Sequence, residues 1–113
     1  LKLEDGRTLY EQVAYKATHD WNSNRNIGLV VGATRPAELR AIRDICDDMT
    51  LLLPGVGAQG ADVTELMQAG QGGGMLISSS RAILYAGDEE DFANAARQVA
   101  LATRDEINRH RIV

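Results

Sequence analysis

Three short apolar runs, each followed by a loop of small residues and then by a helix signal, constrain the fold of this chain most strongly. The runs are "IGLVVGA" (27–33), "TLLL" (50–53) and "MLISSS" (75–80). Continuous apolar runs of this length are typical of strands that are buried on both faces of a parallel sheet. Since strands that alternate with helices indicate βαβ units, we predict an α/β fold with three parallel strands and flanking helices.

Apolar residues at spacings of three and four predict the first two helices. One helix covers 8–21, and a second begins at Thr34 and Pro36, because threonine caps free N–H groups and proline is tolerated in a first turn. The residues predicted to pack on the sheet are Tyr10, Val13, Ala14, Ala17 and Trp21 in the first helix, and Leu39, Ile42, Ile45 and Cys46 in the second.

Three further helical segments are predicted in the second half of the chain. One covers 62–68, where Asp62 and Glu65 suit the positive end of the helix dipole, and it ends at Gly70 and the "GGG" at 72–74. "RAILYA" (81–86) begins as a short helical turn, and Asp88 opens the last helix. The residues of that helix predicted to face inward are Phe92, Ala95, Ala96, Val99, Thr103 and Ile107.

Size and composition limit the class of protein. A chain of 113 residues fits one domain, so we treat residues 1–113 as a single unit. The net charge of -4 gives no general attraction to nucleic acid or to anionic membranes, and no apolar run approaches the roughly 18 residues that span a bilayer. The single cysteine, Cys46, is interpreted as a buried thiol in a reducing compartment, which predicts a cytoplasmic protein.

The loop after the second apolar run, "PGVGAQGAD" (54–62), is the first candidate for chemistry. In parallel α/β folds, ligands bind at the carboxyl ends of the strands, where loops lead into helix N-termini. Gly55, Gly57 and Gly60 lack a Cβ atom, so the backbone there can approach a ligand closely, and Gln59 is the one long donor of the loop.

The loop after the third run is the second candidate. Ser79, Ser80 and Arg81 stand where a helical turn begins, so free N–H groups are combined with a guanidinium that can hold two phosphate oxygens. Two neighbouring loops with such donors predict a phosphate-binding site. A purely structural role for these loops stays open, because glycine-rich connections before an aspartate are common.

Other polar residues are interpreted as structural. Gly55, Gly57 and Gly60 match a GxGxxG spacing, but the long helix and the ribose-binding acid of a dinucleotide site are missing. His19 is interpreted as a surface or half-buried residue and His110 as a solvated helix end, and Tyr85 is expected to pack in the core or an interface. No metal site is predicted.

"GLVVGATRPAELRAIR", "LLLPGVGAQGAD" and "SSSRAILYA", in this order, resemble the C-terminal part of orotidine 5'-phosphate decarboxylase, in particular its longer bacterial subgroup. The resemblance covers about residues 6–108. It implies the C-terminal βα units of a TIM (β/α)₈ barrel. It also implies an enzyme that converts orotidine 5'-phosphate to UMP and carbon dioxide in pyrimidine biosynthesis, without cofactor or metal.

The resemblance also implies roles for individual residues. Gln59 and Arg81 match the glutamine and arginine that contact the substrate phosphate, and the main chain of Ser80 and Arg81 matches the accompanying donors. Pro54 and Val56 match the lining of the base pocket. Ala61 stands where the subgroup usually has a second glycine, a change that keeps these donors.

The lysine and aspartate array on which the family's chemistry depends has no match here. Lys2 and Lys16 are the only lysines, and neither follows a predicted strand, so no catalytic residue is expected in this segment. An alternative is therefore a non-catalytic phosphate-ligand binding or assembly module. Since three open strands leave two unpaired edges, the expected partners are the remainder of a barrel or a second copy in a homodimer, together with orotidine 5'-phosphate or UMP.

Overall fold

The computed structural model describes residues 1–32, 34–56 and 62–111. The described chain contains α1 (Leu9–His19), β1 (Leu29–Val30), α2 (Pro36–Cys46), β2 (Leu51–Leu53) and α3 (Val63–Gly70), followed by β3 (Met75–Ile77), α4 (Arg81–Leu84) and α5 (Phe92–Arg109). The predicted α/β order, with three parallel strands and flanking helices, is confirmed.

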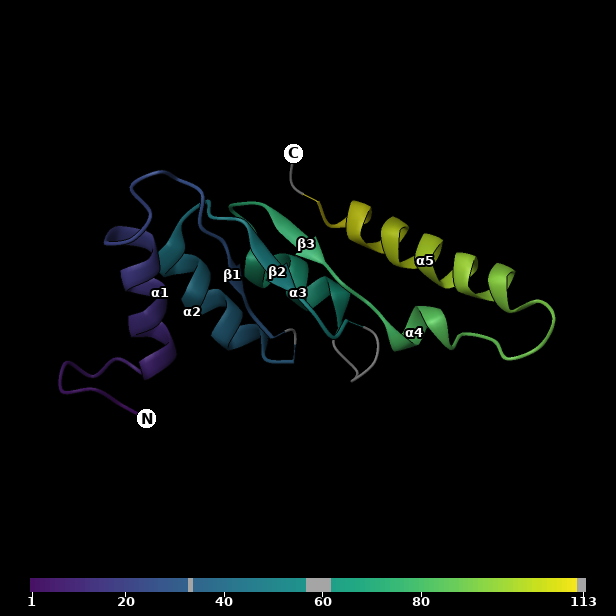
Figure 1. Ribbon diagram of the computed structural model, residues 1–113, viewed down its shortest axis with the longest axis horizontal. Coiled ribbons are helices and arrows are strands. Elements are labelled where there is room, and N and C mark those ends of the chain that lie inside the picture. Colours follow the sequence, from purple (N-terminus) through teal and green to yellow (C-terminus); the bar gives the residue numbers. More distant parts are fainter. Residues whose placement is uncertain (33, 57–61, 112–113) are drawn as a thin grey trace.

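The sheet has the strand order β1-β2-β3, and all its pairs are parallel. In Figure 1 the strands lie in front of α2 and α3, and α5 extends away from the sheet. The molecule measures 55 × 31 × 23 Å and has a radius of gyration of 16.1 Å. A compact chain of this length would have a radius of gyration of about 13 Å, so this segment is elongated.

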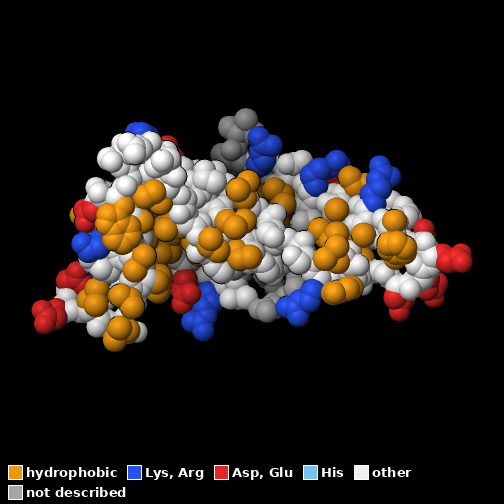
Figure 2. All heavy atoms as spheres, viewed as in Figure 1, with side chains coloured by type: hydrophobic (Ala, Val, Ile, Leu, Met, Phe, Trp, Pro, Cys, Tyr) orange, Lys and Arg blue, Asp and Glu red, His pale blue; other side chains and the backbone are white. Residues whose placement is uncertain are grey.

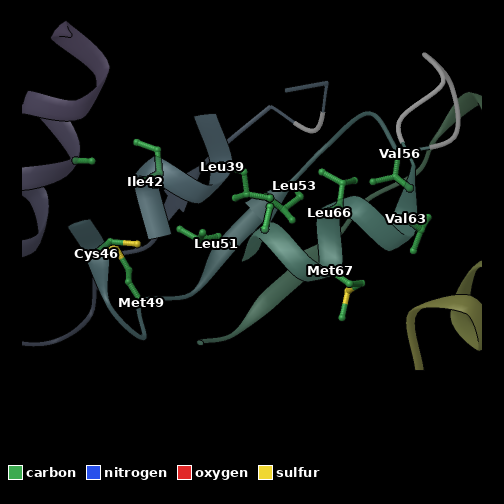
Figure 3. Packing of buried hydrophobic residues seen from close by; sticks show 12 residues of the cluster. Leu39, Ile42, Cys46, Met49, Leu51, Leu53, Val56, Val63, Leu66 and Met67 are labelled. Carbon is green, nitrogen blue, oxygen red and sulfur yellow. The ribbon is translucent and has the colours of Figure 1, made fainter. Parts of the chain in front are cut away.

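The core lies between the sheet and the helices on one of its faces. Leu51 and Leu53 of β2 are fully buried, and Figure 3 shows Leu53 lying between Leu39 of α2 and Leu66 of α3. These two helices carry apolar residues at helical spacing, so each presents one stripe to the strands. The predicted stripe of α2 is confirmed by the burial of Leu39, Ile42 and Cys46.

The opposite face of the sheet is bare, which corrects the prediction that the strands are buried on both faces. Val30, Leu52 and Leu76 pair in register across the three strands, and their exposed fractions are 70%, 37% and 60%. Figure 2 shows hydrophobic side chains gathered over the sheet on this face. Alternate residues of a strand point to opposite faces, and the described helices cover only one of them.

The first helix is less buried than its pattern predicted. Ala14 and Ala17 are buried, but Tyr10, Val13 and Trp21 are exposed because no described segment covers that side of α1. A capping box between Thr8 and Glu11 starts the helix, and the hydrogen bonds from Thr8 lower the pKa of the Glu11 carboxyl.

The beginnings of two helices differ from the predictions. Arg35 rather than Thr34 precedes the first turn of α2, and no side chain caps that end. The last helix begins at Phe92, after Asp91, and not at Asp88. By contrast, Asp62 caps α3 as its charge suggested, since its carboxylate accepts a hydrogen bond from the Thr64 N–H at 2.8 Å.

The predicted inward face of α5 is confirmed in part, because Ala95, Ala96, Val99, Thr103 and Ile107 are half-buried. None of its residues is buried, and Phe92 is 59% exposed. Only its C-terminal end approaches the core, where Ile107 packs against buried residues. The amphipathic pattern of α5 therefore identifies a surface that the described chain covers only in part.

Candidate functional site

The loops that follow β2 and β3 start side by side at the carboxyl edge of the sheet. The Ser78 N–H donates to the Leu53 carbonyl at 3.0 Å, and the Val56 N–H donates to the Ser78 carbonyl at 3.2 Å. Between them, Gly55 turns the chain at a φ of +87°, a conformation that glycine adopts without a steric cost. The first residues of both predicted ligand loops are thus tied together by main-chain hydrogen bonds.

The glycine loop itself lies only partly within the described structure. Pro54 is exposed, whereas the Val56 side chain is 1% exposed and belongs to the hydrophobic core. The predicted contribution of Val56 to a base pocket therefore remains a prediction, and only its main chain, not its buried side chain, could line that pocket. Gln59, Gly57 and Gly60 lie outside the described residues, so their predicted roles are untested.

Arg81 stands at the start of α4, immediately after β3 and its loop. Its side chain is exposed and forms no ion pair with the described residues. The Ser80 carbonyl accepts hydrogen bonds from Ile83 and Leu84, which closes the turn, while the main-chain N–H groups of Ser80 and Arg81 donate to no group in the described part of the chain. In Figure 1, α4 lies at the same lower edge as the carboxyl ends of the strands.

A modest cavity lies beside the loop that follows β3. It has a volume of about 460 Å³, and its lining includes Ser78, Ser79 and Ile83 together with residues of α5. Two larger cavities, of about 860 and 870 Å³, lie beside β3 and β1 respectively. The first lies where β3 begins, and the second reaches the carboxyl end of β1, where Gly32, Thr34 and Arg35 line it.

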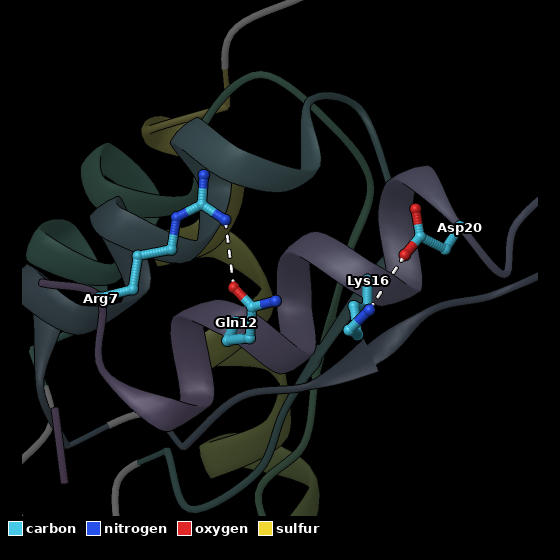
Figure 4. Close-up of polar contacts among 4 residues, drawn as sticks. All are labelled: Arg7, Gln12, Lys16 and Asp20. Carbon is cyan, nitrogen blue, oxygen red and sulfur yellow. Dashed lines mark hydrogen bonds and ion pairs between the residues drawn. The ribbon is translucent and has the colours of Figure 1, made fainter. Parts of the chain in front are cut away.

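Both lysines lie near the N-terminus, and neither belongs to a loop that follows a described strand. Figure 4 shows Lys16 on α1 paired with Asp20 at 3.3 Å, near the hydrogen bond between Arg7 and Gln12. Lys2 pairs with Thr8 in an isolated bridge before α1. No carboxyl end of a described strand therefore carries a lysine.

The other titratable residues follow or correct the predictions individually. Cys46 is free and buried, as predicted, and burial raises the pKa of its thiol. His110 is half-buried rather than solvated, because its Nε2 lies 3.0 Å from the Thr64 hydroxyl of α3. Tyr85 is 76% exposed in the described chain and packs into no core.

Neither metal ligands nor a membrane segment emerge from the described residues. No three histidine, cysteine, aspartate or glutamate side chains of this part gather as metal ligands. None of the helices in these ranges combines the length and the apolar character needed to cross a membrane.

Arg43 is the buried polar residue that the sequence analysis missed. It is 5% exposed and donates hydrogen bonds to main-chain carbonyls at the opposite edge of the sheet. Its position could have been found, because Arg43 lies four residues after Leu39 and three before Cys46, on the buried face of α2.

Curated relatives match nearly the whole chain. Orotidine 5'-phosphate decarboxylase of Ralstonia pickettii (strain 12J) is 56% identical over 110 residues, which cover 95% of this chain and 41% of the relative. The decarboxylase of Dechloromonas aromatica (strain RCB) is 57% identical over 109 residues, with 94% and 40% covered. The chain is a homologue of part of orotidine 5'-phosphate decarboxylase. No family model matches it.

Solved structures agree with this homology. Leishmania donovani UMP synthase has a TM-score of 0.75 and 38% identity, covering 95% of this chain and 24% of the other. Leishmania donovani OMP decarboxylase has a TM-score of 0.73 and 34% identity, covering 96% and 41%. The three parallel strands and flanking helices of the decarboxylase homologue therefore match part of an OMP decarboxylase structure, and the chain spans about 40% of the length of its curated relatives.

Proposed function

We propose that this chain supplies the phosphate-binding loops of an orotidine 5'-phosphate decarboxylase, a lyase that forms UMP and carbon dioxide in pyrimidine biosynthesis. The observation that carries the proposal is the 56% identity over 95% of the chain to a protein of that name. The geometry of the carboxyl edge supports it, because the loops after β2 and β3 start side by side there.

In this proposal Arg81 holds the phosphate of the nucleotide, and Gln59 contacts the same phosphate from the glycine loop. The Arg81 guanidinium is exposed and forms no ion pair within the described ranges, so it does not have to leave a partner to bind an anion. The N–H groups of Ser80 and Arg81 add main-chain donors, and Gly55, Gly57 and Gly60 let the other loop approach. In the same proposal the exposed Pro54 and the main chain of Val56 line the base side of the nucleotide.

Phosphate contacts of this kind serve catalysis from a distance. Binding energy from a part of the substrate that does not react can be used to order the site around the reacting ring. Decarboxylation builds negative charge on the pyrimidine, which a cationic group must stabilise where it develops. Neither Lys2 nor Lys16 is placed for that task, so we propose that the catalytic residues lie outside these 113 residues.

The bare surfaces of the sheet support a second part of the proposal. Val30, Leu52 and Leu76 form an exposed apolar row, and cavities run beside both outer strands. In a closed barrel this row would point into the packed interior. We propose that the remainder of a (β/α)₈ barrel covers it, with a second copy of the chain as the alternative partner, in the reducing cytoplasm that the free Cys46 favours.

The placement of the lysines also favours a second candidate function, a non-catalytic module that binds a phosphate ligand or assists assembly. An assay of the purified 113-residue chain with orotidine 5'-phosphate separates the two. We expect no decarboxylation by this chain alone and full activity from the intact gene product. Tight binding without turnover by the intact gene product would favour the module, and turnover by the isolated chain would contradict our placement of the catalytic residues.

A further inference from the structure

Arg43 is a buried cation that donates to four main-chain carbonyls, and its Nη1 also lies 4.0 Å from the Cys46 Sγ. Its Nε donates to the Gly70 carbonyl at 2.8 Å, and its Nη1 donates to the carbonyls of Asp47 at 2.8 Å and Met49 at 2.6 Å. Its Nη2 donates to the Gly74 carbonyl at 3.1 Å. A guanidinium offers five N–H donors in a fixed plane, which suits four acceptors placed around it.

Two of these acceptors are the C-terminal ends of helices. Gly70 is the last residue of α3, and Asp47 follows the last residue of α2. The last carbonyls of a helix lack intrahelical partners and carry partial negative charge, so a cation there is stabilising. Asp47 also has a φ of 52°, which is unusual for a residue with a side chain, and Arg43 bonds its carbonyl.

The other two acceptors are the entries to neighbouring strands. Met49 lies two residues before β2, and Gly74 directly precedes β3. The Gly74 carbonyl also accepts the Leu51 N–H at 3.0 Å, which is the first rung between these strands. Arg43 therefore holds the two strands at the point where their mutual register begins.

The glycines at 72–74 leave room for this arrangement. A Cβ atom on Gly73 would collide with Arg43 Nη1 and would lie 2.7 Å from the Asp48 Cα. The glycines at 72–74, which were predicted to end α3, therefore also form the surface against which the guanidinium packs.

We propose that Arg43 is a positioning residue for the carboxyl edge, acting through the register of β2 and β3. The register pairs Leu51 with Met75 and Leu53 with Ile77, and only that pairing lets Ser78 bond both Leu53 and Val56 at the far end. The strands are three residues long, so a shift at one end is transmitted to the other. The functional part of this inference rests on the proposed phosphate site.

The first test needs no ligand and uses hydrogen exchange on the intact gene product. In Arg43→Met we expect the amides of Val56 and Ser78 to exchange roughly tenfold faster than in the wild type, because the carbonyls that accept their hydrogen bonds are no longer held in place.

Two control variants of this test are on the same helix. Arg40→Met removes an exposed arginine that also bonds an α3 carbonyl, that of Gln68, at 2.7 Å, and Ile42→Ala opens the core nearby. Equal exchange in Arg43→Met and Ile42→Ala would overturn the inference.

The second test compares the affinities for UMP and for uridine, which lacks the phosphate. We expect Arg43→Met to weaken UMP binding about tenfold and uridine binding less than about twofold, since misplaced donors affect the charge-assisted bonds most. Ile42→Ala should leave the ratio of the two affinities unchanged. A wild type that binds both ligands equally would refute the phosphate site, whereas a strong wild-type preference that Arg43→Met retains would refute the positioning role.

A second variant keeps both tests decisive if Arg43→Met does not fold. Gly73→Ala displaces the guanidinium without removing it, and we expect changes in the same direction, about threefold in size. Arg43→Lys keeps one cation but cannot reach four carbonyls in a fixed plane, so we expect it to restore part of both effects. Wild-type behaviour of Gly73→Ala in both tests would contradict the inference.

Discussion

An arginine lies near each end of the parallel strands, and the two arginines have opposite surroundings. Arg43, at the edge where the strands begin, is 5% exposed and bonds four carbonyls. Arg81, at the edge where they end, is exposed and forms no ion pair within the described chain. The same side chain can thus fix a fold where its donors are used internally, whereas at Arg81, where the described chain does not use them, we propose that they bind a phosphate.

The largest effect on stability is expected from replacing Arg43, the buried arginine. Arg43→Met should lower the free energy of unfolding by about 3 kcal/mol or more, because carbonyls at two helix ends and two strand entries lose their donor. Arg40→Met, on the exposed face of α2, should lower it by less than about 1 kcal/mol. Urea unfolding followed by circular dichroism measures both, and a similar small change in the two variants would contradict the role assigned to Arg43.

Replacing the exposed Arg81 should instead lower ligand affinity and leave stability nearly unchanged. Arg81→Ala should weaken UMP binding by roughly 10- to 100-fold, since a hydrogen bond to a charged group contributes about 1.5–3 kcal/mol. The free energy of unfolding of this variant should change by less than about 0.5 kcal/mol, because the side chain that is removed is exposed and has no partner among the described residues. Titration calorimetry with UMP gives the affinity, and unchanged binding would remove Arg81 from the proposed site.

A smaller effect tests the glycine run beside Arg43. Gly73→Ala should cost about 1–2 kcal/mol of stability, because its Cβ would press on the guanidinium and on the main chain of Asp48. Gly32→Ala is the matched control, since a Cβ there meets no described atom within 4 Å. The midpoints of thermal unfolding compare the two, and equal midpoints would show that the run at 72–74 has room to spare.

The smallest perturbation uses Cys46, whose Sγ lies 4.0 Å from Arg43 Nη1, as a reporter of the buried edge. Burial raises the pKa of this thiol, so the reactive thiolate is scarce at neutral pH and its population rises only at a pH above the ordinary range for cysteine. We expect slow alkylation of the native protein at pH 7 and fast alkylation in urea. Saturating UMP should leave the native rate unchanged, because the ligand is proposed to bind at the other edge.

The sequence predicted the order of elements well because each strand and each buried helix carries a strong local pattern. Leu51 and Leu53 of the second apolar run and Leu39 of the second helix lie in the core, as predicted. The prediction of burial on both faces was wrong for Val30, Leu52 and Leu76. The apolar character of a residue predicts that it is buried, but it does not show whether the described chain supplies the segment that buries it. The same holds for Phe92 on α5.

The position of the candidate site could be predicted from the sequence, whereas the contacts that hold its loops in place could not. Arg81 and the start of the glycine loop were placed at one edge by the rule that ligands bind where parallel strands end. The hydrogen bond between Val56 and Ser78, which joins the two loops, depends on strand register and leaves no sequence signal. Arg43 was overlooked because an arginine on a helix normally indicates a solvated face, although its spacing from Leu39 and Cys46 places it on the buried face of α2.

The most direct measurement is a crystal structure of the intact gene product with UMP bound. The proposed function predicts one phosphate with oxygens within about 3 Å of both the Arg81 guanidinium and the Gln59 side-chain amide, and a hydrogen bond from the Arg81 or Ser80 main chain. A phosphate bound away from these groups, or two side chains too far apart for a single phosphate to bridge them, would contradict it.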